Sequence, residues 1–381
     1  MWILLVPAVL VMACSRDRLE PGSYHGRGNG GEVVEDTVDV PDHSLVMCGV
    51  EYPQGYDWKR DSLMGMVQGK VFLSDLDGIL MERRAGVGTD VSLDEDMHRI
   101  VDGALWEDWS TGSETVVRRD GVEVLRWDGR EMVTDLVIRD SAVFALTVPR
   151  SGGGFVLRRD GDVVARSDEY YPVSPFYEDG AALCFNARTD DGLWAVVRDG
   201  EIVPSEVDDG EMLQVYSIDN ESIVACLTED GLVCLSDGRL LLEDRYISPD
   251  AVYFTYDGKD LYVEAQSSFG FMSSYKCWRG SELIVDEPNV RRLASCVSGG
   301  HFYALCQNVQ QRSLAVFSDS GPVYVPAGYV SATRPVIVAW KEHFYVSLLG
   351  PDGTPAILAD HTIYDFHFNG RFDDLACVAR K

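Results

Sequence analysis

One pattern returns about every 40 residues along most of this chain: an Asp-Gly pair between two short runs of alternating apolar residues. The stretch VLRRDGDVVARS, residues 156–167, shows it in full, with Asp160 and Gly161 at its centre. Taken alone, Asp160 fits a calcium ligand, a catalytic carboxylate or a turn residue. Equivalent turns, some with other residues in place of Asp or Gly, fall near residues 78, 120, 160, 199, 237, 280, 320 and 360. The period predicts a small structural unit repeated many times.

A second turn lies about twenty residues before most of these positions, and an apolar run follows each. Asp-Gly between alternating apolar runs predicts a β-hairpin, because both central residues of a type I′ turn need positive φ. Each unit therefore reads as four short antiparallel strands. The second turns are expected at Asp102-Gly103, Asp140-Ser141, Asp179-Gly180, Asp219-Asn220, Asp257-Gly258, Gly299-Gly300 and Lys341-Glu342.

Four strands per 40 residues predict an all-β fold, a β-propeller of four-stranded antiparallel blades over residues 45–381. Counting the outer hairpins gives eight blades, with seven as the alternative if the N-terminal segment packs outside the repeat. The two ends break the pattern. Residues 43–75 have no clean first turn, and Asn369-Gly370 follows Asp360 by nine residues only. We therefore expect a closing blade that takes strands from both termini.

The chain is strongly acidic, with 33 Lys and Arg against 62 Asp and Glu and a net charge of −29. This balance argues against nucleic-acid binding and against charge-driven docking on an anionic membrane. It suits a neutral or cationic partner. Apolar residues make up 46% of the chain, enough to bury a sizeable core.

The first fourteen residues, MWILLVPAVLVMAC, contain an apolar run of signal-peptide length that is too short to span a membrane as a helix. The run ends in Ala13-Cys14. It resembles the lipobox of bacterial lipoproteins, which implies cleavage after residue 13 and lipidation of Cys14. Two features depart from that pattern: Met12 is bulky, and no Lys or Arg precedes the run. The alternative is a plain hydrophobic N-terminus.

Residues 14–44 are rich in Gly, Pro and charge and predict a flexible tether. Their GRGNGG fits G-x-G-x-x-G formally, but no strand precedes it and no helix follows, so it is not a dinucleotide loop. With the repeat, these features resemble β-propeller lipoproteins of the Bacteroidetes-type bacterial cell envelope. The resemblance implies an outer-membrane lipoprotein, periplasmic or surface-facing, attached to the membrane by its N-terminal lipid alone.

The nine cysteines include Cys14, and none forms a C-x-x-C pair. We expect the other eight to be mostly free, small core residues, with a disulfide as the alternative. Cys48 is expected on a first strand of its unit and Cys377 on a second strand. The seven histidines are scattered without metal-ligand spacing, so the sequence predicts no metal and no cofactor.

Two stretches depart from the repeat, and a long loop adds a third source of candidate contacts for a ligand or partner. Residues 50–62 gather aromatic and basic residues, 94–115 carries two tryptophans, and the loop at 266–278 holds apolar residues among serines. Such aromatic side chains stack on sugars or anchor peptides. The alternative is that the first stretch staples the ring closure and the tryptophans of the second pack between blades. The candidates are Tyr52, Tyr56, Trp58, Arg60, Trp106, Trp109, Phe269 and Phe271.

No catalytic constellation emerges from the sequence, which has no G-x-S-x-G and no S-x-x-K. LSDLDGIL and FSDSGPVYV miss the spacing of sialidase Asp-boxes. The first hypothesis is a lipid-anchored, non-enzymatic binding or scaffold propeller that presents a face to a protein or glycan. The alternative is a carbohydrate-active enzyme, a glycoside hydrolase or lyase with carboxylates in the central funnel. A purely structural part of an envelope complex is a third possibility.

Overall fold

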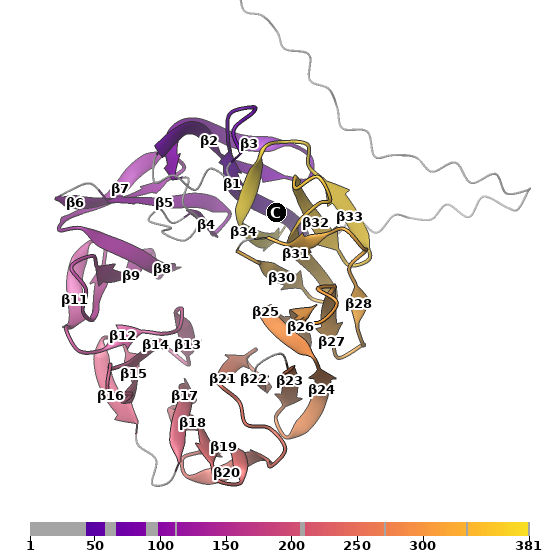
Figure 1. Cartoon of the computed structure of the whole chain (residues 1–381). Helices are drawn as coiled ribbons and strands as arrows, with labels where there is room; N and C mark the ends of the chain where they lie inside the picture. Colours follow the sequence, from indigo (N-terminus) through magenta and orange to yellow (C-terminus); the bar gives the residue numbers. More distant parts are fainter. Residues whose placement is uncertain are drawn as a thin grey trace, which may run out of the picture. The chain divides into compact units, whose positions relative to one another are not determined.

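The computed structural model describes residues 43–57, 66–88, 98–110, 113–205, 210–269, 272–332 and 334–379. These residues form 34 β-strands in eight antiparallel sheets, and no helix occurs among them. Within these ranges there is accordingly no apolar helix of membrane-spanning length. The sheets are the blades of an eight-bladed β-propeller, ordered around a ring in Figure 1. The predicted fold and blade number are confirmed.

Each blade is a meander whose first strand lies innermost. Blade 1 contains β34 (Gly370–Ala379), β1 (His43–Glu51), β2 (Met66–Asp75) and β3 (Ile79–Gly88). Blade 2 contains β4 (His98–Val101), β5 (Ala104–Ser110), β6 (Glu114–Arg119) and β7 (Val122–Asp128). Blade 3 contains β8 (Glu131–Arg139), β9 (Ala142–Pro149), β10 (Phe155–Arg159) and β11 (Asp162–Ser167). Blade 4 contains β12 (Tyr171–Pro172), β13 (Tyr177–Asp179), β14 (Ala182–Arg188), β15 (Trp194–Arg198) and β16 (Glu201–Ser205).

The second half of the ring repeats this order. Blade 5 contains β17 (Glu211–Ile218), β18 (Glu221–Thr228), β19 (Gly231–Ser236) and β20 (Arg239–Asp244). Blade 6 contains β21 (Ala251–Tyr256), β22 (Leu261–Phe269), β23 (Met272–Arg279) and β24 (Glu282–Pro288). Blade 7 contains β25 (Val290–Ser298), β26 (His301–Asn308), β27 (Leu314–Ser318) and β28 (Val323–Tyr324). Blade 8 contains β29 (Val330–Ser331), β30 (Ile337–Trp340), β31 (His343–Leu349), β32 (Pro355–Ala359) and β33 (Thr362–Asp365).

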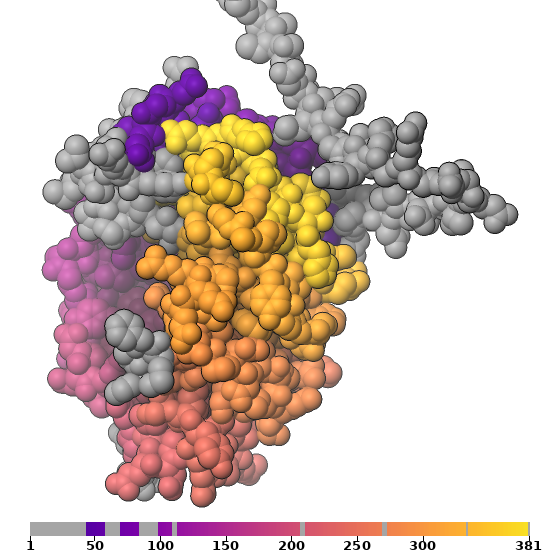
Figure 2. All heavy atoms as spheres, turned by 45° about the vertical axis from the view of Figure 1, so that its right-hand side comes forward, coloured from indigo at the N-terminus to yellow at the C-terminus, as the bar shows by residue number. Residues whose placement is uncertain are grey.

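The ring closes through blade 1, where the C-terminal strand β34 pairs antiparallel with β1 from His43↔Ala379 to Glu51↔Gly370. In Figure 2 the yellow C-terminal residues accordingly pack against the indigo and purple N-terminal ones. The predicted closing blade shared by both termini is confirmed. The strand positions predicted for two cysteines are wrong: Cys377 lies on the first strand of blade 1 and Cys48 on the second, because the innermost strand comes from the other end of the chain.

The Asp-Gly turns are the predicted two-residue hairpins. Asp160 and Gly161 have φ of 50° and 92°, and Arg159 pairs with Asp162 across the turn. The side chain adds a second function, because Asp160 Oδ1 accepts the Val143 amide at 2.8 Å while the Asp160 amide donates to the Val143 carbonyl. The same reciprocal pair joins four further third-to-fourth-strand turns to the second strand: Asp120 with Leu105, Asp199 with Leu183, Asp237 with Ser222 and Asp360 with Phe344. Asp160 is therefore a structural residue.

In a four-stranded meander the first-to-second and third-to-fourth turns lie at the same end. We call the side of the ring that carries these turns the hairpin face, and the opposite side the loop face. His43 begins β1 on the hairpin face, since it pairs with the end of β34.

The core consists of clusters between neighbouring blades, because each sheet buries both faces against the next. Phe155 of blade 3 meets Phe185 of blade 4 edge to face, with ring centroids 4.9 Å apart. Tyr262 of blade 6 stacks on Phe302 of blade 7 at 5.6 Å. The eight described cysteines are free, as expected, and all but Cys296 and Cys377 are fully buried.

Polar side chains also join neighbouring blades. Each accepts a hydrogen bond from a backbone amide on or beside the inner strand of the next blade. Asp374 accepts Ile100 N at 2.8 Å, Asp108 accepts Val133 N at 3.1 Å, and Asp135 accepts Phe176 N at 2.5 Å. Gln266 accepts Arg292 N at 2.8 Å. In blades 1, 3, 5 and 7 a β-bulge interrupts the pairing of the first and second strands. Bulges redirect side chains, and here Asp374 and Asp135 directly follow one.

The inner strands of blades 4 and 8 are split, which the repeat in the sequence does not predict. Pro175 and Pro335 lie in the interruptions between β12 and β13 and between β29 and β30. Proline has no amide to donate to a sheet, so the ladder stops there. Serine hydroxyls replace part of it: Asn186 N donates to Ser174 Oγ at 2.8 Å, and Val336 N donates to Ser347 Oγ at 2.9 Å.

Replacing Asp160 by alanine is expected to lower the free energy of unfolding by about 2 kcal/mol, since alanine disfavours the left-handed backbone and offers no acceptor for Val143 N. Urea unfolding monitored by circular dichroism measures the change. Asp160→Asn should retain most of the stability, because asparagine tolerates this conformation and keeps the acceptor. The exposed neighbour Asp162 is the control, and Asp162→Ala should change stability by less than about 0.5 kcal/mol. Equal losses at both positions would contradict the structural role of Asp160.

Candidate functional site

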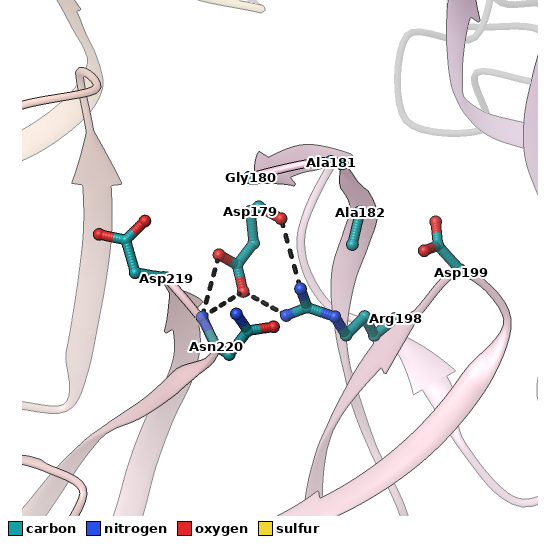
Figure 3. A pocket seen from close by; sticks show the side chains of 8 residues that line it. All are labelled: Asp179, Gly180, Ala181, Ala182, Arg198, Asp199, Asp219 and Asn220. Atoms are coloured by element: carbon teal, nitrogen blue, oxygen red, sulfur yellow. Dashed lines mark hydrogen bonds and ion pairs between the residues drawn. The ribbon is translucent and has the colours of Figure 1, made fainter.

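A pocket of about 440 Å³ opens on the hairpin face where blades 4 and 5 meet. Three turns supply its walls: β13–β14 and β15–β16 of blade 4, and β17–β18 of blade 5. Figure 3 shows the lining residues from close by. They are Asp179, Gly180, Ala181, Ala182, Arg198, Asp199, Asp219 and Asn220.

Asp179 is the buried centre of the pocket, 2% exposed at the end of β13. Arg198 Nη1, at the end of β15, donates to Asp179 Oδ2, and Ser217 Oγ of β17 donates to the same oxygen at 2.5 Å. The Asn220 amide approaches both carboxylate oxygens at 3.3 Å. Asp179 therefore ties its own blade to the next, and Arg198 and Asn220 converge on it in Figure 3.

An aromatic stack joins β13 and β17, the strands that carry Asp179 and Ser217. The rings of Tyr177 on β13 and Tyr216 on β17 stack with centroids 4.1 Å apart and an interplanar angle of 20°. Tyr177 Oη also donates to Asn186 Oδ1 at 2.8 Å. This stack spans the junction of blades 4 and 5 directly beside Asp179 and Ser217.

The charge state of Asp179 follows from its surroundings. Burial pushes the pKa of this carboxyl up, but the hydrogen bonds from Ser217, Arg198 and Asn220 together outweigh burial and lower its pKa below the ordinary value. Asp179 is therefore an anion at neutral pH. A general acid in glycoside hydrolysis needs a raised pKa, so the buried carboxylate of this pocket is unsuited to that role.

Two further carboxylates flank the pocket. The Asp199 side chain is 62% exposed, and its Oδ1 accepts the Leu183 amide at 2.9 Å. Arg139 of blade 3 approaches the same oxygen to 4.0 Å. Asp219 begins the β17–β18 turn with φ of 53°, and its side chain lies on the opposite side of the pocket in Figure 3. Since Asp179 and Arg198 neutralise each other, the lining residues carry a net negative charge, which suits an ammonium or guanidinium group.

Among the described residues, no group of three or more His, Cys, Asp or Glu side chains is arranged to hold a metal ion.

Of the residues proposed from the sequence at 50–62, Tyr52 and Tyr56 belong to the ring closure. Tyr52 is 2% exposed, and its ring lies 5.7 Å from that of half-buried Tyr56. The Tyr52 amide donates to the Asn369 carbonyl, and Asn369 Nδ2 donates to the carbonyls of Pro53 and Tyr56 at 2.9 and 2.7 Å. Burial leaves Tyr52 no surface for a partner, which favours the stapling alternative.

Trp106 is likewise a core residue. It is 1% exposed and packs with Val117 and Trp127 between blades 2 and 3, which favours the alternative of packing between blades. Trp109 and Phe269 lie on β5 and β22, but their side chains are outside the described part of the chain. Cys14, Trp58, Arg60 and Phe271 are outside the described residues altogether.

The pocket could not be predicted from the sequence, because its residues look like ordinary turn residues of the repeat. The turn predicted at Asp179-Gly180 is displaced by one residue: Asp179 pairs with Ala182, so Gly180 and Ala181 form the turn. A shift of one residue moves a side chain to the other face of a strand. The available signal was Ala181, where other blades have a polar or glycine residue at the second turn position.

No family model matches the sequence, and no curated protein matches it. The fold is similar to that of solved propellers. Dihydro-heme d1 dehydrogenase NirN, in complex with DHE, superimposes with a TM-score of 0.51 at 10% identity, over 87% of this chain and 78% of NirN. The WD40 domain of SCAP from fission yeast gives a TM-score of 0.45 at 9% identity, over 88% of this chain and 96% of that domain. At these identities the similarity concerns the fold alone.

Asp179→Asn is expected to lower the free energy of unfolding by about 2 kcal/mol at pH 7, because half-buried Arg198 loses its counter-ion. Because the pKa of Asp179 is lowered by folding, this carboxylate stabilises the folded chain at pH values above 3.8, the ordinary pKa of aspartate. The stabilisation is lost as the pH falls below that value. Urea unfolding at pH 7 and pH 3 should therefore show a smaller difference from the wild type at pH 3. Asp219→Asn is the control and should change stability by less than about 0.5 kcal/mol. A difference independent of pH would contradict the assigned ion pair.

Proposed function

We propose that this chain is a non-enzymatic binding propeller that uses its hairpin face to bind a protein partner through a basic side chain. The pocket at blades 4 and 5 is the observation that supports this proposal. Its floor is a neutralised ion pair, Asp179 with Arg198, and its rim carries Asp199 and Asp219. A lysine or arginine side chain is long enough to enter such a pocket while its backbone stays at the surface.

The charge of the whole chain supports the same kind of partner. With a net charge of −29, the chain attracts basic proteins over distances up to a Debye length, which speeds their encounter. Asp199 and Asp219 on the rim then direct the basic partner to the pocket. They lie on turns whose backbone the repeat holds firmly, so little ordering is required on binding.

We further propose that Cys14 carries a lipid and anchors the propeller to the outer membrane of a bacterial cell envelope. The support is the apolar run of residues 3–12, which ends in Ala13-Cys14, and the polar tether that follows.

The double variant Asp199→Asn/Asp219→Asn should weaken binding of a pentalysine peptide by at least about tenfold in fluorescence anisotropy at 150 mM salt. Asparagine preserves both left-handed turns and the acceptor for Leu183 N. The matched control is Asp102→Asn/Asp120→Asn, which removes two charges from the equivalent turns of blade 2 and should weaken binding by less than about threefold.

Equal losses in the two double variants would contradict the pocket and indicate only general attraction to an acidic surface. A glycan array probed with the same proteins tests the other class of partner. Glycan binding that survives in the pocket variant would overturn the assignment of a basic protein partner.

The anchor has its own test. In a bacterial host that processes lipoproteins, Cys14→Ser should move the protein from the detergent phase to the aqueous phase of a Triton X-114 extraction, since lipidation needs the thiol. Mass spectrometry of the wild-type N-terminal peptide should show an acylated Cys14. Unchanged partitioning of Cys14→Ser would refute the anchor without affecting the proposed pocket.

A further inference from the structure

The pocket at blades 4 and 5 is also contacted from outside, by an arginine of blade 3. Arg139 is the last residue of β8, on the hairpin face, and its side chain is 23% exposed. Its guanidinium reaches across the junction of blades 3 and 4 to the two turns of blade 4 that form walls of the pocket. Arg139 is therefore placed to act on the pocket without lining it.

The first contact fixes the β13–β14 turn. Arg139 Nη2 donates a hydrogen bond to the carbonyl oxygen of Ala181, the second residue of that turn. This is the turn whose displacement by one residue places Asp179 inside the pocket. A hydrogen bond from a guanidinium is stronger than one between neutral groups, so it holds the turn firmly in the displaced position.

The second contact concerns the rim of the pocket. Arg139 Nη1 lies 4.0 Å from Asp199 Oδ1, the same oxygen that accepts the Leu183 amide at 2.9 Å. Because both neighbours act on Oδ1, the oxygen that remains for a ligand is Oδ2. In Figure 3, Asp199 stands across the pocket from Asp219. Arg139 thus helps to set the orientation of one of the two rim carboxylates.

The repeat shows that the contact with Ala181 is a variant of a common one. At two other junctions the last residue of the inner strand also bonds to the first turn of the next blade. Asn220 N approaches Asp179 Oδ1 at 3.3 Å, and Lys341 N donates to Ser298 Oγ at 3.0 Å. In both, a side-chain oxygen accepts a backbone amide. At blade 3 the direction is reversed, because an arginine side chain only donates.

Arg139 has two effects of opposite sign on a basic ligand. Its positive charge repels the ligand, whereas its hydrogen bond to Ala181 preorganises the wall, so less ordering is left for the ligand to impose. At 4.0 Å its ion pair with Asp199 is a long one, and the Asp199 side chain is 62% exposed, so solvent screens the charge. The hydrogen bond to Ala181 is direct. Preorganisation should therefore outweigh repulsion.

We propose that Arg139 is a positioning residue of the pocket. It fixes the wall formed by Ala181 and Asp199, and so raises the affinity for a basic side chain although it carries the same charge as that ligand. This inference rests on the proposed binding function of the pocket. It adds a residue of blade 3 to a site whose lining comes from blades 4 and 5.

The test is the affinity of a pentalysine peptide for Arg139→Met, measured by fluorescence anisotropy at 150 mM salt, well below the melting temperature of either protein. Methionine keeps much of the length of the side chain but has neither charge nor donor. Binding should weaken by about fivefold, although the variant is more acidic than the wild type. If Arg139 acted by its charge alone, binding would instead tighten by up to about twofold. Unchanged or tighter binding would overturn the proposal.

Two further variants complete the series. Arg239→Met is the matched control, because it removes the same charge from an exposed residue at the start of β20, on the hairpin face of blade 5. It should tighten binding by less than about twofold. Arg139→Lys keeps the charge and a donor for Ala181, and should bind to within about twofold of the wild type. Binding by Arg139→Lys as weak as that of Arg139→Met would contradict the role of the hydrogen bond to Ala181.

A measurement without ligand separates this proposal from the function on which it rests. Hydrogen–deuterium exchange of residues 180–186 should be faster in Arg139→Met than in the wild type, and unchanged in Arg239→Met. If the wild type does not bind the peptide, the proposed function fails, while faster exchange still supports the positioning role. Exchange equal to that of the wild type would overturn the positioning role, whatever the peptide does.

Discussion

The pairing of β34 with β1 is the interaction on which the rest of the molecule depends. A four-stranded blade has two faces to bury, and only a closed ring buries both faces of every blade. In blade 1 the innermost strand comes from the C-terminus and the other three from the N-terminus, so this pairing holds the two ends of the chain together. The clamp of Asn369 on Pro53 and Tyr56 reinforces it from the loop face.

Within the closed ring, buried carboxylates join neighbouring blades by directional hydrogen bonds, because they accept backbone amides of the next blade. Hydrophobic packing has no such direction. The consequence depends on what else surrounds each one. Where a cation and a hydroxyl reach the carboxylate, as at Asp179, its pKa falls and the anion is permanent. Where amides are the main partners, as at Asp374, burial dominates and the pKa rises. The same structural device therefore shifts the two pKa values in opposite directions.

The rigidity of the repeat also explains where a binding site arises. Most turns of the hairpin face repeat one geometry and expose their aspartates to solvent. At the junction of blades 4 and 5 the first turn of blade 4 is displaced by one residue, which turns Asp179 inward to meet Arg198 and Ser217. The neighbouring turns keep the standard geometry, and their Asp199 and Asp219 become the rim. The pocket is thus a local departure supported by regular neighbours.

Local backbone preference and periodicity, read from the sequence alone, determined the four-stranded unit, the shared closing blade and the role of Asp160 as a turn residue. They also gave a count of eight blades, with seven as the alternative. These signals act within a few residues and recur along the chain, so they can be read without knowledge of the fold. The tertiary structure alone decided that Trp106 and Tyr52 are buried and that Asp179 is a strand residue. It also brought Asp373 to His98, 275 positions away in the chain, and Asp374 to Ile100 N. Those outcomes depend on a one-residue register and on contacts between distant strands, and neither has a local signature in the sequence.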